Sequence, residues 1–431
     1  MSRELLRKFI IAAFTATLAV WTASAQTDGT YVGYSPYSVF GIGNLHNQGT
    51  SWNRGMGGVG IAARNKRFVN IMNPASVTAR DSLSFMADFG LSGKLSLYSD
   101  SGKGGYNAAL NIDDFVISFP IWKSSAMYLG VTPLSDVGYR ISYSEVDEYS
   151  VSRTFTSTGN GGLYQVFAGG AVTFWNRLSL GAQFSYNFGA ITKTATNVNG
   201  DTSYKDFAAG DSLQINNFGA KLALQYEQPV SAKDAITLGV TYAFSTPMTG
   251  YHYHFTENGG KSRSRDINYL SDKGVRMGDQ FGVGISYRSS DVWMAEFDYT
   301  RSSWLGSGLD KVQGFSNNGE SYFATSLAQG FRAGFEITPG RNDVRYYLRR
   351  CTYRAGAYYE QSYYTVDGAH VDSFGITLGM TLPVFRWYNG ISFALDIGRR
   401  GLVKGQIGEN YFGFNLGLNM FDIWFKKPRY E

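Results

Sequence analysis

The sequence has little charge, a single cysteine and no long apolar run after its first 25 residues. Cys351 has no cysteine partner, which excludes an intrachain disulfide and a cysteine-based metal cluster, and we expect it to pack as a small strand residue. Charged residues make up 17% of the chain, below the roughly 25% of an ordinary soluble protein. The net charge of +5 contains no basic block, so nucleic acid is not an expected partner. Beyond residue 25 there is no stretch of about 18 apolar residues, and no membrane helix is predicted there.

The first 25 residues have the three parts of a secretory signal peptide. The basic start consists of Arg3, Arg7 and Lys8. An apolar run follows over residues 9–20, and Ala23-Ser24-Ala25 supplies the small residues of a cleavage site. Gln26 follows this site where a lipid-anchored protein has cysteine. The pattern predicts an exported protein without a lipid anchor.

Aromatic residues and glycine are abundant, and together they favour strands and tight turns. Tyr and Phe occur 30 times each and glycine 52 times. The clearest strand pattern lies between Asn410 and Phe425, where apolar residues take every second position: Phe412, Phe414, Leu416, Leu418 and Met420. Glycine and asparagine fill the positions between them. Because strand side chains alternate between two faces, one face is apolar and the other is small and polar.

The same alternation recurs from Leu83 onward and predicts about 14 strands, an even number as in single-chain bacterial barrels. Charged residues fall on the non-apolar parity, as a wet or plugged lumen requires, because Arg or Lys facing lipid at mid-bilayer costs roughly 2–4 kcal/mol. We therefore predict an all-β fold: a transmembrane antiparallel β-barrel over residues 81–431, preceded by an irregular segment over residues 26–80.

The predicted connections between strands alternate in length. Short connections contain or adjoin Pro120, Pro229, Pro339 and Pro383. Longer, polar connections are expected as loops over residues 99–108, 145–161, 196–211, 256–273 and 306–321. Short turns on one rim and long loops on the other are typical of an outer-membrane barrel, with the turns and both termini in the periplasm. A soluble sandwich gives no reason for this asymmetry.

Residues 26–80 lack clean alternation and are rich in glycine, asparagine and proline. The stretch from Gly55 to Arg64 reads GMGGVGIAAR. Its spacing fits neither GxGxxG after a strand nor GxxxxGK[ST], so a nucleotide site is not expected. A barrel of about 14 strands is wide enough to need a plug or to leave a water channel. The irregular residues predict such a plug.

The order of Gly55 to Arg64, then Asn73, Pro74 and Ala75, then a first strand resembles the FadL/TodX family of outer-membrane transporters for long-chain fatty acids and other hydrophobic compounds. This resemblance implies a 14-stranded barrel plugged by an N-terminal hatch that carries the Asn-Pro-Ala motif. It also implies uptake of hydrophobic molecules, released by hatch movement or through a side opening at a kinked third strand. From the residues alone, Asn73-Pro74 builds a turn, and a gating role rests on the resemblance.

Pro133 falls inside the third predicted strand, and Gly138 follows it. Proline within a strand interrupts the ladder and usually marks an edge or a bulge. In a closed barrel this predicts a local gap in the wall. The gap is either a bulge without a function or a lateral portal for an apolar ligand, as the family resemblance implies.

Other candidate site residues are few. The four histidines are His46, His252, His254 and His370. His252 and His254 share a strand face and could supply two metal ligands, although Tyr and His are also common near membrane interfaces. No local signature of a histidine-dependent enzyme accompanies them, so we predict neither an enzyme nor a cofactor. The lumen cations expected for an acidic head group are Lys221, Arg288 and Arg332.

These observations predict a bacterial outer-membrane channel for passive uptake of hydrophobic or amphipathic small molecules such as fatty acids. The expected partners are outer-membrane lipids and the ligand. An alternative is a barrel subunit that does not transport, but serves as a docking or shuttle protein of an outer-membrane secretion or assembly complex. In that case the long connections would be its partner surfaces.

Overall fold

The structure is a computed structural model that describes most of the chain after residue 34. The described residues are 35–81, 83–100, 103–146, 152–199, 206–258, 263–312, 314–315, 317–318, 321–384, 390–403 and 405–423. The predicted signal peptide and its cleavage site lie outside this set. Within it, no helix is long and apolar enough to cross a membrane.

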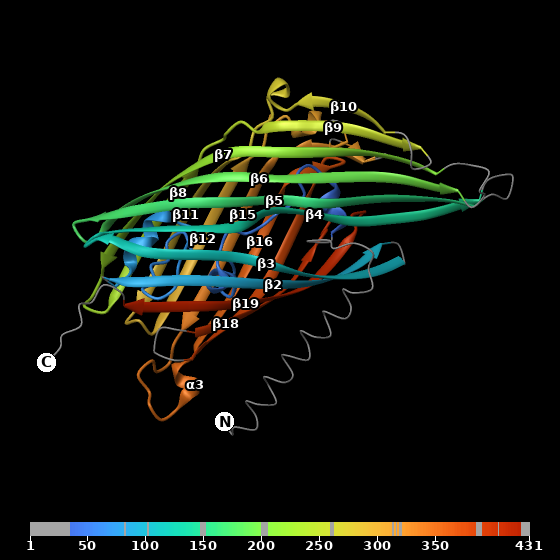
Figure 1. The fold of residues 1–431 in the computed structure, drawn as a ribbon. Coiled ribbons are helices and arrows are strands. Elements are labelled where there is room, and N and C mark those ends of the chain that lie inside the picture. The colour runs from blue at the N-terminus through green and yellow to red at the C-terminus, as the bar shows by residue number, and fades with distance from the viewer. Residues whose placement is uncertain are drawn as a thin grey trace.

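Fourteen antiparallel strands form a closed barrel, which β19 completes by pairing with β2 (Figure 1). In ring order they are β2 (Ser84–Asp100), β3 (Lys103–Trp122), β4 (Ser125–Val146), β5 (Ser152–Phe174), β6 (Leu178–Asn199), β7 (Phe207–Pro229), β8 (Asp234–Ala243), β11 (Asp279–Ser289), β12 (Trp293–Ser303), β15 (Leu327–Ile337), β16 (Thr352–Val366), β17 (Ala369–Pro383), β18 (Gly390–Arg400) and β19 (Gly408–Ile423). This confirms the predicted fold class.

Shorter elements complete the described chain. The additional strands are β1 (Asn44–Leu45), β9 (Thr249–Asn258), β10 (Arg263–Tyr269), β13 (Asn317–Asn318) and β14 (Ser321–Thr325). The helices are η1 (Pro36–Val39), α2 (Ser51–Arg54), η2 (Pro74–Ala79), η3 (Ser271–Lys273), η4 (Leu309–Lys311) and α3 (Tyr347–Arg350). β9 and β10 pair with each other, and β9 extends the sheet from β7.

The outer surface carries the apolar parity of the strands, as the sequence pattern predicts. Phe184 and Phe218 are more than two-thirds exposed on neighbouring strands. On the inner parity of the same strands, Gln183 and Asn217 are buried. An apolar exterior around a polar, filled interior is the arrangement of a membrane barrel.

The two ends of the barrel differ, but less through loops than the sequence suggested. We call the end with the connections at residues 123–124, 175–177 and 230–233 the turn end, and the opposite end the hairpin end. At the hairpin end, β4 to β7 run on as strands of 22 or 23 residues, about twice the length that crosses a bilayer. Most of the predicted loops 99–108, 145–161 and 196–211 are therefore strands.

At the hairpin end, Ser and Thr lie on both faces of these strands. This polar composition resembles a loop in the sequence, but it is compatible with a pair of strands that water surrounds on both faces. Ser142 and Thr156, for example, are hydrogen bonded across β4 and β5 at 2.9 Å. A second correction is at the turn end. The predicted short connection after Ile337 instead runs to Cys351 and contains α3, which projects from the barrel (Figure 1).

Bulges and breaks shift the strand parity at three places. On β3 the pairing with β2 shifts between Gly90 and Leu91, which turns both Asp113 and Asp114 inward. On β4 the shift lies between Pro133 and Ser135, as predicted, although the strand continues through it. Between β8 and β9 the chain is interrupted around Pro247, so that β8 ends at Ala243 and β9 begins at Thr249.

Residues 35–80, which we call the N-terminal segment, lie inside the barrel (Figure 1, blue). Toward the hairpin end, the residues around η1 join a large buried apolar cluster with strand and loop residues such as Ile215, Leu309 and Phe323. Toward the turn end, η2 packs against β5, β6 and β7. The lumen is thus occupied along much of its length by the chain's own residues.

Candidate functional site

The middle of the N-terminal segment is held by two carboxylates that point inward from β12. Asp298 accepts hydrogen bonds from the backbone N–H groups of Gly60 and Ile61, at 2.8 and 3.0 Å. Glu296 accepts those of Ala62 and Ala63, at 2.7 and 2.9 Å. Four consecutive N–H groups of the glycine-rich stretch are therefore bound to carboxylates of the wall.

Glycines in the wall allow the segment to approach the strand backbone. A Cβ atom on Gly239 would lie 2.1 Å from the carbonyl oxygen of Ile61, and one on Gly356 would lie 2.2 Å from the amide nitrogen of Gly57. Such distances are shorter than any van der Waals contact. Only glycine fits at these positions while the segment stays in place.

Asn73, Pro74 and Ala75 form the start of η2. The side-chain oxygen of Asn73 accepts the N–H of Ala75 at 2.9 Å, and its side-chain nitrogen donates to the carbonyl of Ile61 at 2.7 Å. The motif therefore caps a helix and ties it to the carboxylate-bound stretch. A role of Asn73, Pro74 and Ala75 in gating stays a prediction.

Arginines add charged ties between the segment and the wall. Arg54 forms an ion pair with Asp113, one of the two residues turned inward by the β3 bulge. Arg64 lies near Glu227 at 3.3 Å and donates to Gln225 at 3.1 Å. Burial lowers the pKa of the Arg64 guanidinium, and the charge of Glu227 partly offsets this shift.

The wall is interrupted between β3 and β4. Their pairing runs from Trp122–Ser125 to Phe115–Val131, and in the described part of the chain it goes no further toward the hairpin end. Beyond that point β3 pairs only with β2, and β4 pairs with β5, while the two strands diverge (Figure 1). We call this opening, between residues 103–114 of β3 and 132–146 of β4, the notch. Pro133 and Gly138 both lie on its β4 side.

The N-terminal segment lines the β4 side of the notch. Asn44 and Leu45 of β1 pair with Asp136 and Ser135. Gln48 donates to the carbonyl of Pro133 at 3.1 Å, which gives Pro133 a direct contact with the segment. Near the hairpin end, the N–H of Ser35 donates to the carbonyl of Gly138 at 2.9 Å, and that of Gly138 donates to Ser38 Oγ at 3.1 Å.

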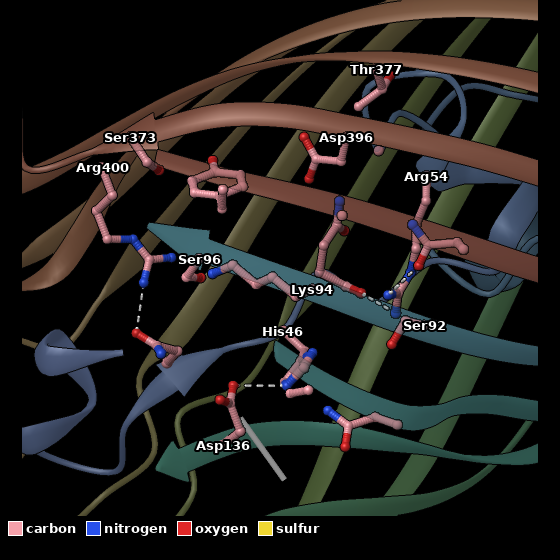
Figure 2. A pocket seen from close by; sticks show the side chains of 18 of the residues that line it. His46, Arg54, Ser92, Lys94, Ser96, Asp136, Ser373, Thr377, Asp396 and Arg400 are labelled. Atoms are coloured by element: carbon pink, nitrogen blue, oxygen red, sulfur yellow. Dashed lines mark hydrogen bonds and ion pairs between the residues drawn. The ribbon is translucent and has the colours of Figure 1, made fainter. Parts of the chain in front are cut away.

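A cavity of about 210 Å³ lies behind the notch (Figure 2). Its lining joins Asn111 of β3 and Asp136 of β4, one from each side of the notch, to residues of β2 and β16 to β19. His46 Nε2 lies 2.9 Å from Asp136 Oδ1 in this lining. Lys94 lies 2.9 Å from the buried Glu409. The cavity is polar, with charges of both signs.

A second cavity, of about 280 Å³, lies toward β5 to β8, β11, β12 and β15. Residues 44–47 line both cavities and so form a partition between them. The three cations predicted to bind an acidic head group differ in their partners. Arg288 is bound to Glu227 at 2.9 Å and Arg332 is paired with Glu360. Lys221 lines the second cavity, and among the described residues none forms a hydrogen bond or ion pair with its side-chain ammonium group.

The histidines have structural partners. His252 and His254 share one partner, Asp211 Oδ1, at 2.8 and 3.1 Å, and His370 lies 3.2 Å from the carbonyl oxygen of Ser362. No group of three or more metal-binding side chains occurs among the residues that the structure describes. Cys351 is buried at the end of α3 and not within a strand.

Strand alternation places Glu296 and Asp298 on the lumen side of the wall but gives them no role, and the sequence gives no sign of the partition at residues 44–47. Alternating Glu and Asp on one parity was the available signal for an anchor. What they bind could not be read, because their partners are backbone groups more than 230 positions away in the chain.

Comparison with known proteins identifies the family of this barrel. The sequence model of the BamG family matches residues 5–431. The chain belongs to the BamG family. No curated protein matches it.

Solved structures with the fold of this BamG-family chain are also known. The toluene transporter TbuX of Ralstonia pickettii is 13% identical with a TM-score of 0.56, over 86% of this chain and 97% of that one. The toluene transporter TodX of Pseudomonas putida is 14% identical with a TM-score of 0.55, over 90% and 100%. A FadL homologue of Pseudomonas aeruginosa is 10% identical with a TM-score of 0.53, over 89% and 100%. The predicted resemblance to FadL/TodX is thus confirmed as a shared fold.

Proposed function

We propose that this chain is an outer-membrane channel for the passive uptake of amphipathic or hydrophobic small molecules, with fatty acids among the candidates. The observation that carries the proposal is the notch between β3 and β4, with a cavity directly behind it. A gap in the wall gives an apolar ligand a route that avoids the filled hairpin end of the lumen. The fold shared with toluene transporters supports the same reading.

The polar lining favours an amphipathic ligand with an acidic head group. The ligand passes from the notch into the first cavity, crosses the partition at residues 44–47, and reaches the second cavity. There Lys221 is the cation left for the head group, because Arg288 and Arg332 already bind carboxylates. Movement of the N-terminal segment opens the partition, and the short turns face the periplasm.

Locking the partition tests this route. Leu45 and Ser135 are paired across β1 and β4, so Leu45→Cys with Ser135→Cys, in a Cys351→Ala background, joins the segment to the wall. Uptake of a labelled fatty acid into cells is expected to fall when the disulfide forms and to return on reduction. The single variants are the matched controls. Equal uptake in the locked and reduced states contradicts the route.

A second candidate function is that of a subunit in a larger envelope assembly. The observation in its favour is the length of the β4–β5 and β6–β7 hairpins, which extend well beyond the bilayer and expose aromatic side chains such as Tyr143 and Phe207. Gentle purification separates the two candidates. A stable complex with larger envelope proteins and no extracted ligand favours the subunit, whereas a monomer that releases fatty acid in mass spectrometry favours the channel.

A further inference from the structure

A small pocket lies at the turn-end rim of the barrel, where the N-terminal segment meets the β11–β12 turn. Five of the residues that line it are cationic: Arg64, Lys66 and Arg67 of the segment, Arg288 of β11, and Arg341 of the connection that contains α3. We call it the rim pocket. Its volume is about 40 Å³, well below the roughly 300–1,000 Å³ of a pocket for a drug-sized ligand. It has room for a compact group of a few atoms.

The carboxylates around the rim pocket do not balance its cations. A single oxygen of Glu227 is shared by two of them, at 3.3 Å from Arg64 Nε and 2.9 Å from Arg288 Nη2. Lys66 is exposed at the mouth, and within the described ranges no acid forms an ion pair with it. Positive charge therefore exceeds negative charge at this part of the rim.

The two carboxylates of the lining itself are already bound. Asp291 Oδ2 lies 3.3 Å from Arg341 Nη1. Glu336 Oε2 accepts hydrogen bonds from Arg354 Nε at 2.8 Å and from Trp52 Nε1 at 2.7 Å. An anion that enters the rim pocket therefore meets cations, and the nearby acids are occupied by their own partners.

The rim pocket borders the lipid-facing surface as well as the lumen. Trp293 and Met294, which are neighbours on β12, both line it. Because adjacent residues of a strand point to opposite faces, the pocket lies where the two faces of the wall meet. On the outer face, the ring of Trp293 packs against those of Tyr287 and Phe335, with centroids 5.2 and 6.0 Å apart. Aromatic side chains at the ends of membrane strands lie at the level of the lipid head groups.

We propose that the rim pocket binds the phosphate of an anionic glycerophospholipid of the periplasmic leaflet, whose acyl chains lie against Trp293, Tyr287 and Phe335. Guanidinium groups suit phosphate because they offer paired N–H donors, and the excess positive charge selects an anionic lipid over a zwitterionic one. Since residues 64–67 belong to the N-terminal segment, the lipid ties that segment to the membrane. This site requires the proposed placement of the turns in the periplasm, but it does not require transport.

Lipid retention by the purified barrel tests the site. The protein in detergent is mixed with dioleoylphosphatidylglycerol or with dioleoylphosphatidylcholine, which has the same acyl chains, and bound lipid is measured by native mass spectrometry. We expect phosphatidylglycerol to stay bound under conditions that remove phosphatidylcholine. Equal retention of the two lipids overturns the proposal.

A pair of double variants locates the binding. Lys66→Ala with Arg67→Ala removes two cations of the rim pocket, and retention of phosphatidylglycerol is expected to fall several-fold. The matched control, Arg177→Ala with Lys233→Ala, removes two exposed cations from other turns of the same end and should retain the lipid. No loss in the first variant, or an equal loss in both, overturns the proposal.

The contact with the acyl chains is tested separately. Trp293→Leu keeps the wall apolar but removes the aromatic ring, and we expect several-fold lower retention of phosphatidylglycerol. Trp175→Leu, at a position that is 83% exposed on another turn, is the control. Heat-dependent gel mobility shows that each variant has folded. Unchanged retention in folded Trp293→Leu contradicts the proposed seat of the lipid.

Free phosphate and lipid A carry the same phosphate chemistry, and two measurements distinguish them from the phospholipid. Inorganic phosphate at the concentration of the lipid should not displace it, because the ion does not contact the aromatic cluster; displacement would overturn the lipid assignment. Lipids extracted from the gently purified protein are then identified. Lipid A in place of a glycerophospholipid would overturn the periplasmic leaflet as its source. A failure of fatty-acid uptake, by contrast, would remove the channel and leave this site unchanged.

Discussion

Two junctions of the barrel wall, β19 with β2 and β3 with β4, are built in opposite ways. The first joins strands from the two ends of the barrel sequence, and it is paired without interruption from Gly408–Ser99 to Ile423–Ser84. The second joins neighbours in a hairpin, yet pairing stops at Phe115–Val131. The junction between the strands farthest apart in the sequence is paired along its whole length, whereas the junction between two consecutive strands is paired over only part of its length.

The difference lies in what covers each strand edge. An unpaired backbone group inside lipid costs several kcal/mol, so the β19–β2 junction must be satisfied by the wall itself. At the notch, the N-terminal segment supplies bonds to Pro133, Leu134, Asp136 and Gly138 from the inside. The wall can therefore open where a second part of the chain satisfies the edge.

Breaking the complete junction has the largest expected effect. Leu418 pairs with both Phe89 and Ile391, so Leu418→Pro removes a ladder donor inside lipid. We expect the yield of folded barrel, measured by heat-dependent gel mobility, to fall by about tenfold or more. The control is Ser144→Pro on the open edge of β4, which should fold normally. Similar losses in both variants would mean that the two junctions are equally sensitive.

The second-largest effect is expected when the N-terminal segment, which lines the notch, is loosened. The double variant Glu296→Ala, Asp298→Ala removes the side-chain acceptors of four N–H groups, and we expect a loss of roughly 2–4 kcal/mol in the free energy of unfolding. Thermal unfolding measures the loss, and faster protease cleavage within residues 55–65 locates it. Asp291→Asn, an exposed acid of a turn, is the control. A double variant with unchanged protease resistance would show that these bonds do not hold the segment.

Crowding the segment has a smaller effect. Gly239→Val places a side chain against the carbonyl of Ile61, and overpacking of this kind costs about 1–3 kcal/mol. Gly105→Val, where nothing lies within 4 Å of the added Cβ, is the matched control on a free part of the wall. Comparison of their thermal midpoints tests whether only glycines beside the segment matter; equal shifts would argue against it.

The smallest effect on stability, with a separate effect on uptake, is expected for Pro133→Val. Valine restores a donor at the bulge, so stability should change by less than about 0.5 kcal/mol. Uptake should slow if the notch narrows. Pro229→Val at the turn end controls for loss of a proline. Unchanged uptake removes Pro133 from the route.

Sequence periodicity predicts the strands of the wall because each strand keeps one face in lipid. This requires an apolar residue at every second position, which can be recognised in the sequence. The pattern from Phe412 to Met420 is an example in which every apolar residue of the prediction faces outward. Periodicity fails where the constraint is absent. Beyond the bilayer, β4 and β5 carry Ser and Thr on both faces, so the strand around Thr156 reads as a loop.

The site is less predictable than the wall, because its contacts join distant parts of the chain. The bulge at Pro133 could be predicted from the sequence, because proline disturbs the strand that contains it. The bulge at Asp113 and Asp114 could not, because strand alternation predicts that only one of the two side chains points into the barrel, whereas the bulge turns both inward. The bond from Gly60 to Asp298 depends on the whole ring of strands, which no local pattern encodes.

The grip of Glu296 and Asp298 on residues 60–63 also constrains the order of assembly. The part of the chain synthesised first finds its binding groups on a strand made more than 200 residues later. Until β12 arrives, those four N–H groups must stay hydrated, so the glycine-rich stretch cannot take up its bound position before that part of the wall has formed.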